Sequence, residues 1–340
     1  MSNKIVLDAF GGDNAPIEIV KGAVNSVLSQ NEFDVCLVGK EDVIKSELSK
    51  YKFDENRIEI INASEVVTND DVPTDAIKNK KDSSLVVGLD SFKKRDDLVG
   101  FVSAGSTGAV LTGSIFKVGR IRGISRPALA PILPTVNGGN VLMLDIGANV
   151  DCKPEYLCQF AIMGTAYMRD VYKVNSPRVA LLSNGTEDKK GNALTKEVFP
   201  LLKEMSGINF VGNMEAREIL SGEYDVIVTD GFAGNVALKG TEGAVLTVLA
   251  LLKQEIMSSF MSKIGALFLK KSFKNLKRKL DYNKSGGAPL LGIDKVVVKS
   301  HGSSKAVSIT ASLKQAYDLY QSKYIDNIRN SVNRSEGINE

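Results

Sequence analysis

Short apolar runs recur along the chain, and each is followed by a loop rich in Gly, Ser and Asn and then by an amphipathic segment. This order predicts strands alternating with helices around a mostly parallel sheet. The six strands expected on this basis cover residues 4–10, 98–103, 141–146, 179–182, 225–229 and 295–299. A helix is expected after each strand. The first, third and fifth helices are expected to begin near Pro16, near Pro154 and at Asn235, and the second, fourth and sixth to end near Val118, Leu202 and Tyr324.

One hairpin interrupts this series. Residues 128–135 and 141–146 flank the tight-turn sequence Asn137-Gly138-Gly139, which predicts an antiparallel pair of strands. We therefore expect a three-layer α/β/α fold with a mixed, mostly parallel sheet. Asp13 or Asn14 is expected to cap the helix that begins near Pro16.

The composition is that of a globular chain. Of 340 residues, 43% are hydrophobic and 24% are charged, which excludes disordered and fibrous classes. The net charge of +3 is too small to indicate a nucleic-acid partner. Three cysteines do not make a disulfide framework, and a single histidine, His301, excludes a His-rich metal site. Nothing in the spacing of the acidic residues demands magnesium, so we expect no cofactor.

The same pattern predicts the organisation and location of the chain. The apolar run 5–7 is interrupted by Asp8, and the longest apolar stretch, 244–252, is shorter than the ~20 residues of a membrane span. A soluble protein of a reducing cytosol is therefore expected.

The length predicts roughly two domains. We expect one catalytic unit of two subdomains over 1–330, a protruding helical arm over 243–285 and a disordered tail over 331–340.

The loops that follow parallel strands open at the carboxyl edge of a sheet, where ligands bind. Each Gly-rich loop alone is an ordinary turn. Six of them converging on one edge favour an anion site built from backbone N–H groups at helix N-termini.

Short motifs along the chain resemble those of a known family, the bacterial acyl carrier protein:phosphate acyltransferases of phospholipid synthesis. The motifs that carry the resemblance appear in order from residue 4 to about residue 320. They are DAFGGDNAP (8–16), SAGSTGA (103–109), LDIGANVD (144–151), PEYL (154–157), QFA (159–161), KGN (190–192), FVGN (210–213), DGFAGN (230–235), GGAPLLG (286–292) and HGSS (301–304). The sequence departs from the usual family pattern at Ser106, at Ser183-Asn184 and at Lys78, where the family has Asn, Asn followed by Ile or Val, and Arg.

The resemblance implies a fold and a reaction. The fold is that of the phosphate acetyltransferases and the isopropylmalate dehydrogenase group. Inorganic phosphate attacks the thioester of an acyl carrier protein, giving acyl phosphate and the free carrier thiol. The product feeds glycerol-3-phosphate acylation, and a downstream acyltransferase is a possible partner. The resemblance also implies a homodimer and peripheral association with a membrane.

Such chemistry needs a held phosphate and a stabilised oxyanion rather than a nucleophilic triad. Lys190, in a polar loop, is a candidate to neutralise phosphate or the oxyanion, or is a solvated loop lysine. Asn235 is expected to donate its amide to the oxyanion or to phosphate, or to be an ordinary N-cap, or both. His301 is a candidate to orient phosphate or to protonate the leaving thiolate, or it is structural.

Asp8, Asp145 and Asp230 each end a strand, and because carboxylates repel phosphate they are expected to accept loop N–H bonds, to position Lys190 or simply to cap. Lys78, Lys80 and Lys81 are either a solvated face or a contact for phosphopantetheine or an acidic carrier protein. The phosphate- and acyl-binding candidates are Asp8, Gly11, Gly12, Asn14, Ser103, Gly105, Thr107, Gly108, Asp145, Asn149, Asp230, Gly234, Ser303 and Ser304.

Residues 251–284 form a basic amphipathic arm with nine positive and two negative side chains. Apolar residues recur there at helical spacing. A dimer interface, a solvated basic face and a hairpin lying on anionic lipid are the three interpretations. We expect the base to dimerise and the tip to bind lipid. The lipid-facing candidates are Phe260, Ile264, Leu267, Phe268, Lys270, Lys271 and Lys274.

Two other classes of function compete with the acyltransferase. One is a different enzyme of similar fold, either a phosphate acetyltransferase that uses coenzyme A or a dinucleotide-dependent dehydrogenase. No strand-linked Gly-x-Gly-x-x-Gly fingerprint is evident, which weakens the dehydrogenase. The other is a non-catalytic membrane scaffold, which would not need polar loops at the strand ends.

Overall fold

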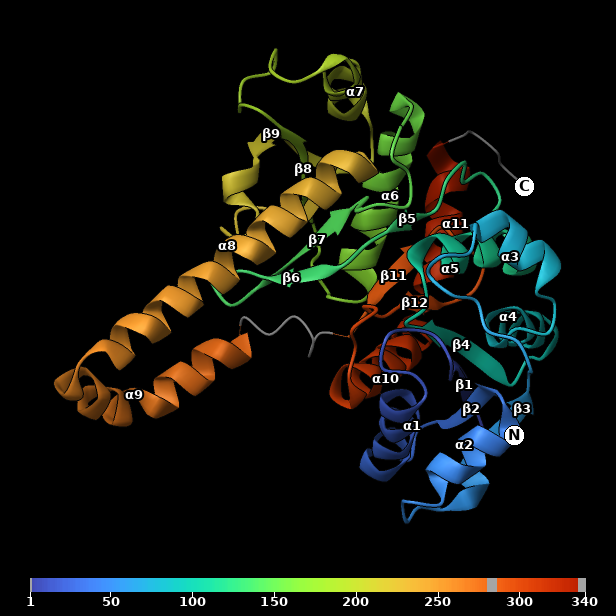
Figure 1. The fold of residues 1–340 in the computed structure, drawn as a ribbon. Helices are drawn as coiled ribbons and strands as arrows, with labels where there is room; N and C mark the ends of the chain where they lie inside the picture. Colours follow the sequence, from blue (N-terminus) through green and yellow to red (C-terminus); the bar gives the residue numbers. More distant parts are fainter. Residues whose placement is uncertain (1, 280–285, 336–340) are drawn as a thin grey trace.

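The computed structural model describes residues 2–279 and 286–335 (Figure 1). Twelve strands within them form two sheets. The first has the order β3-β2-β1-β4-β12-β11-β5 and the second the order β6-β7-β10-β8-β9. In the first sheet β1 to β4 and β12 run parallel, while β11 is antiparallel to both β12 and β5. In the second only the β6–β7 pair is antiparallel.

The strand bounds are as follows: β1 Lys4–Asp8, β2 Asp34–Gly39, β3 Ile58–Asn62, β4 Leu98–Ser103, β5 Ala128–Leu129, β6 Ile132–Pro134, β7 Asn140–Leu144, β8 Arg178–Ser183, β9 Asn209–Glu215, β10 Val226–Val228, β11 Ala288–Leu291 and β12 Val297–Lys299. The α-helices are α1 Ile17–Ser29, α2 Glu41–Leu48, α3 Pro73–Asn79, α4 Ser84–Lys94, α5 Thr107–Gly113, α6 Pro154–Asp170, α7 Ala193–Glu204, α8 Gly231–Ser258, α9 Phe260–Lys279, α10 Ala306–Ser322 and α11 Tyr324–Ser335.

Both faces of the first sheet are covered by helices. Ile5 and Leu7 of β1 belong to the same buried cluster as residues of α1 and α10, whereas Val6 belongs to the cluster of α4 and α5. Successive strand residues point to opposite faces, so an uninterrupted apolar strand requires cover on both sides. The expected α/β class and its layered, mostly parallel arrangement are confirmed.

The expected strand 128–135 is wrong as a single element. It is broken into β5, which joins the first sheet, and β6, which pairs with β7 in the second. Pro131, between them, has no N–H to donate to a ladder, and its carbonyl accepts from Met143 N. The hairpin around Asn137 is confirmed, with β6 as its first strand and β7 as its second. The segment before it carries the chain from the first sheet into the second.

The C-terminal end is helical beyond the expected boundary. Helix α11 runs to Ser335, and its residues Ile328 and Val332 are buried. Residues 331–335 therefore do not belong to the disordered tail that we expected, because an apolar stripe fastens this helix to the body. Residues 336–340 lie outside the described part of the chain.

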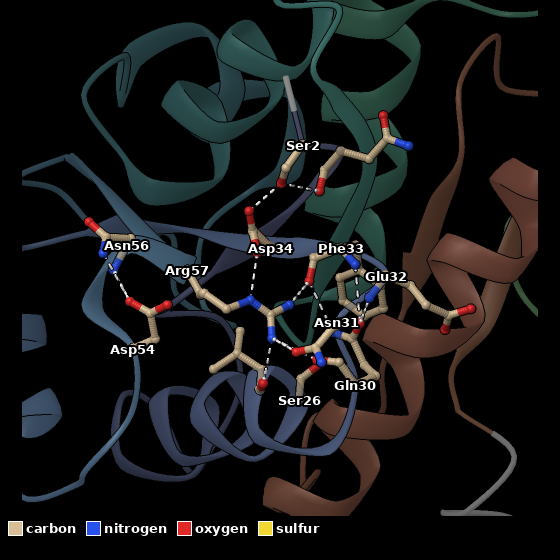
Figure 2. A network of polar contacts seen from close by, with 12 residues as sticks. Ser2, Ser26, Gln30, Asn31, Glu32, Phe33, Asp34, Asp54, Asn56 and Arg57 are labelled. Carbon is tan, nitrogen blue, oxygen red and sulfur yellow. Dashed lines mark hydrogen bonds and ion pairs between the residues drawn. The ribbon is translucent and has the colours of Figure 1, made fainter.

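Arg57 fastens the end of α1 to the start of β2 (Figure 2). Its guanidinium donates to Asp34 Oδ1 at 2.8 Å, to the carbonyl oxygens of Val27, Gln30 and Phe33 at 2.6 Å each, and to Asn31 Oδ1 at 2.9 Å. The last carbonyls of a helix have no partner within it, and a planar guanidinium supplies several donors at once. Arg57 therefore joins the C-terminal end of α1 to the first residue of β2.

Candidate active site

The loops after β1, β4 and β12 are joined by side chains at the strand ends. Asp8 accepts from Ser103 Oγ at 2.7 Å and from Phe10 N at 3.2 Å. Asn14 Nδ2 donates to the carbonyls of Ser303 and Ser304 at 3.0 and 3.2 Å. Asn14 therefore binds the neighbouring loop, and the expectation that Asp13 or Asn14 caps α1 is wrong, because Pro16 holds the N-cap position without a side-chain cap.

Gly11 permits this close approach. A Cβ at residue 11 would lie 2.6 Å from Asp8 Oδ2 and 2.7 Å from Gly105 N. Gly105 N in turn donates to Ser103 Oγ at 3.0 Å, and Ser106 caps α5 by accepting from Ala109 N at 3.2 Å. Because Ser caps a helix as Asn does, the departure at Ser106 preserves this local structure.

In the second sheet, Asp145 organises the loop after β7. It is fully buried and accepts from the backbone N–H groups of Leu129, Ala148 and Asn149 at 2.9, 3.1 and 2.6 Å. Asn149 Nδ2 donates to Pro127 O at 2.8 Å. Burial raises the pKa of both Asp145 and Asp8, although the hydrogen bonds that they accept oppose the rise.

Helix α8 begins earlier than expected. Asp230 accepts from Ala233 N at 2.7 Å and is the N-cap, so Asn235 lies in the second turn and is not a cap. Gly234 allows the helix to touch the β7 loop, since a Cβ there would lie 2.0 Å from Asp145 O. Asn235 Nδ2 donates to Ile146 O at 3.1 Å, which places its amide beside Gly147.

A cavity of about 320 Å³ lies where the loops and helices of the two sheets meet. Three of the predicted residues line it: Thr107, Asn235 and His301. The other lining residues with polar side chains are Lys239, Glu242, Lys299 and Ser300. The apolar wall is formed by Leu129, Pro131, Ile132, Leu133, Ile146, Leu238 and Ala288. This combination of a polar end and an apolar wall suits a small anion beside an acyl chain.

His301 is held in one orientation. Its Nδ1 accepts from Ser303 N at 3.2 Å and lies 2.8 Å from Ser303 Oγ. Acceptance at Nδ1 leaves the proton on Nε2. Partial burial, with Lys239 and Lys299 nearby, lowers the pKa of His301, so the ring is neutral near pH 7.

Lys299 was not a sequence-based candidate, yet it lines the same cavity. It is 8% exposed, and burial lowers the pKa of its ammonium to about 8, against the opposing influence of Asp13 and Asp8. The available signal was its place in the sequence, at the end of an apolar strand and two residues before His301.

Several predicted residues lie outside this cavity. Lys190 is exposed in the loop between β8 and α7, next to Gly185, and Ser183 at the end of β8 keeps a buried hydroxyl without a hydrogen-bond partner. Lys80 pairs with Asp71 at 2.6 Å and donates to Val66 O, whereas Lys78 and Lys81 are exposed. The described residues contain no group of three or more His, Cys, Asp or Glu side chains placed to hold a metal.

A larger cavity, of about 580 Å³, lies apart from these residues. Arg120, Arg126, Glu155 and Tyr156 are among its lining, and none of the predicted site residues is. The strand-end loops therefore point to the smaller cavity.

Helices α8 and α9 form a hairpin that extends away from both sheets (Figure 1). Ser259 caps α9 at the tip by accepting from Ser262 N at 3.0 Å. Phe260, Met261 and Phe268 are 76%, 75% and 84% exposed, Ile264 is 38% exposed, and Lys270 and Lys271 are exposed. The side chains of Leu267 and Lys274 lie outside the described part of the structure.

By length and composition alone, α8 could cross a membrane. The apolar part of α8 is therefore longer than the stretch 244–252 found in the sequence. However, Gly231, Gly234 and Leu238 in its first turns are buried in the body of the protein.

The two-sheet α/β fold is that of the phosphotransacylases. The structure superposes on a phosphotransacetylase from Streptococcus pyogenes with a TM-score of 0.58 and 17% identity, covering 97% of this chain and 94% of the other. A branched-chain phosphotransacylase from Enterococcus faecalis V583 gives a TM-score of 0.56 and 14% identity over 94% and 99% of the two chains. These likenesses concern the fold.

The chain belongs to the phosphate acyltransferase family, and it is an acyltransferase that uses phosphate as acceptor. The family model described as "Fatty acid synthesis protein" matches residues 3–327. Phosphate acyltransferases from Clostridium tetani and Dictyoglomus turgidum are 45% and 48% identical to it, each over 97% of this chain and 98% of the relative. The resemblance found in the motifs is confirmed.

Proposed function

We propose that the chain transfers a fatty acyl group from the thioester of an acyl carrier protein to inorganic phosphate, and that the acyl phosphate enters phospholipid synthesis. The observation that supports this most directly is the cavity, which joins amide, imidazole and ammonium groups to an apolar wall. Membership of the phosphate acyltransferase family supports phosphate as the acceptor.

The reaction forms one bond and breaks one. A phosphate oxygen attacks the thioester carbonyl, and the tetrahedral intermediate expels the carrier thiolate. The proton of hydrogen phosphate ends on the thiol, so acyl phosphate and carrier thiol are the only products. Because phosphate is already a nucleophile, the protein's task is to position it and to stabilise the oxyanion.

Asn235 and His301 are suited to these tasks. Asn235 is held by its bond to Ile146 O, and its second amide N–H remains available to the oxyanion. The Nε2–H of neutral His301 donates to phosphate or to the departing sulfur. Lys190 would approach from the β8 loop once the substrates are bound, as expected for a residue on an exposed loop.

The strand-end loops supply backbone donors and fix the cavity. Gly12 and Gly108 would serve the phosphate through the main chain. The N–H groups of Gly105, Ser303 and Ser304 hold the loops in shape instead, because they donate to Ser103 Oγ, to His301 Nδ1 and to His301 O. Asp8, Asp145 and Asp230 act indirectly. Their carboxylates accept hydrogen bonds from N–H groups of the loops and so hold the loops in place.

The acyl carrier protein, an acidic partner, would meet Lys78 and Lys81, whose ammonium groups are exposed. Lys80 is held by Asp71, so its part is to shape the loop. The hairpin would associate with a second copy through its base, making a homodimer, and with anionic lipid through its tip. The enzyme would thus work in the cytoplasm at the membrane surface and pass its product to a glycerol-3-phosphate acyltransferase.

The test mixes the full chain with labelled phosphate and either a long-chain acyl carrier protein or the matching acyl-coenzyme A. Acyl phosphate is trapped as the hydroxamate. We expect product from the carrier protein, and about 10²-fold slower turnover in Asn235→Ala, as for loss of one oxyanion donor. Asn209→Ala, on exposed β9, is the control. No product from either donor contradicts the reaction, and equal use of both donors contradicts carrier selectivity.

A further inference from the structure

Lys299 is a buried lysine at the carboxyl end of β12, and it faces the cavity together with Asn235 and His301. Lysine is almost never buried without a partner, because removing its charge from water is costly. Its environment therefore requires an explanation.

No ion pair neutralises Lys299 in the described part of the chain, although the charges of Asp13 and Asp8 favour its protonated form from a distance. Among the described residues, no carboxylate lies within ion-pair distance of Lys299, and its ammonium donates to the carbonyl of Ser300. The other lysine of the cavity lining, Lys239, already pairs with Glu242 at 3.0 Å. The buried carboxylate of Asp8 accepts from Ser103 and Phe10 instead.

An ammonium group has three N–H donors, and Ser300 O uses one. The remaining donors and the full positive charge belong to a side chain that lines the cavity. An anion with several oxygens would satisfy both. The neighbouring loops add backbone donors, as in other phosphate sites.

We infer that Lys299 is the residue that holds the phosphoryl group of the acceptor in the cavity, an inference that rests on the proposed function. It would fix inorganic phosphate beside Asn235 while the acyl carbonyl approaches along the apolar wall formed by Ile132 and Leu133. The same chemistry would also recognise the phosphodiester of a pantetheine arm, so the experiment has to separate the two.

The first experiment measures steady-state kinetics of Lys299→Met, Lys299→Arg and the control Lys295→Met. Lys295 lies just before the same strand, is also partly buried, and donates to Phe92 O outside the cavity. We expect the KM for phosphate to rise at least 10-fold in Lys299→Met, with partial recovery in Lys299→Arg, while the KM for acyl carrier protein is unchanged. Lys295→Met should match the parent.

Two results would overturn the inference. An unchanged KM for phosphate in folded Lys299→Met removes Lys299 from the phosphate site. A rise confined to the KM for the acyl donor assigns Lys299 to the pantetheine phosphodiester instead.

The second experiment needs no variant and no turnover. The parent protein is pulsed with acetic anhydride, with inorganic phosphate or with chloride at equal ionic strength, and labelling at each lysine is quantified by mass spectrometry. Phosphate should protect Lys299 several-fold and leave Lys295 unaffected. If phosphate protects Lys299 but no acyl phosphate forms, the proposed function is rejected and the phosphate site at Lys299 stands. If acyl phosphate forms but phosphate does not protect Lys299, the phosphate site is rejected and the proposed function stands.

Discussion

The carboxylate of Asp8 and the hydroxyl of Ser103 meet at 2.7 Å across the ends of the adjacent strands β1 and β4. Both side chains are buried. The hydrogen bond ties the two loops that begin at these residues, and it offsets part of the burial that raises the pKa of Asp8. The shape of this edge of the sheet therefore depends on a carboxyl group that the protein keeps out of solvent.

Ser103→Ala should destabilise the fold by about 1–3 kcal/mol, because it removes a donor from a buried carboxylate. Urea denaturation gives the free energy of unfolding. Ser114→Ala is the matched control: its buried hydroxyl donates to Val110 O, which also accepts a backbone N–H, so the loss should be smaller. Equal losses of unfolding free energy in the two variants would mean that the hydrogen bond to Asp8 contributes no more than the hydrogen bond to Val110 O.

Gly234→Ala should impair both stability and turnover. Its Cβ would lie 2.0 Å from Asp145 O, so the first turn of α8 must move and take Asn235 with it. Overpacking of this kind costs about 1–3 kcal/mol. Gly240→Ala, on the same helix with nothing near its Cβ, should instead stabilise by about 0.5–1 kcal/mol. Thermal melts and hydroxamate assays of both variants check the opposite signs.

Lys299→Met should be more stable than the parent at pH 7. In the folded state the pKa of Lys299 is lowered from 10.5 to about 8, against the influence of Asp13 and Asp8. Below pH 8 both states carry the proton, and the folded state bears the full cost of a buried charge, up to about 3 kcal/mol. Between pH 8 and 10.5 the unfolded state binds more protons, so parent stability rises and the gap narrows. A gap that is absent at pH 7, or that widens toward pH 10, would contradict this.

The sequence predicted the strand-end loops well, because Gly-rich turns after apolar runs are local signals. It predicted that the loops carrying Asn235 and His301 converge, and both residues line one cavity although they follow strands of different sheets. It missed Lys299, because burial of a lysine depends on tertiary packing and leaves no periodic trace. It also missed the break at Pro131, where one apparent strand serves two sheets, since the pairing partners lie far along the chain.

The Arg57 contact was likewise outside what the sequence could predict, since its partners come from the end of one helix and the start of the next strand. Arg57→Ala should cost about 3 kcal/mol of unfolding free energy, because it removes the cationic partner of the largely buried Asp34 and a donor to several backbone carbonyls. Arg217→Ala, whose side chain is 78% exposed in its pair with Glu215, should cost less than about 1 kcal/mol. Chemical denaturation of both variants measures the difference. Comparable losses would show that the contacts in Figure 2 add no more than a surface ion pair.

The tip of the hairpin offers the test of the proposed membrane association. Phe260 and Met261 are mostly exposed at the start of α9, and Lys263, Lys270 and Lys271 follow on the same helix. Burying an exposed Phe or Met side chain in the interfacial region contributes about 1.5–3 kcal/mol, and each basic residue near an anionic surface adds about 1 kcal/mol.

Phe260→Ser with Met261→Ser should therefore reduce binding to phosphatidylglycerol vesicles by at least about 100-fold. Reversal of Lys270 and Lys271 to Glu should remove the preference over phosphatidylcholine, most clearly at low salt, because these attractions are screened. Phe116→Ser is the matched control, since Phe116 is 71% exposed on the body of the protein, outside the hairpin. Vesicle flotation reports all three. Unchanged flotation of the tip variant at low salt would contradict the lipid contact. If light scattering then showed that this variant is a monomer, the exposed apolar residues would be assigned to the interface between two copies of the chain.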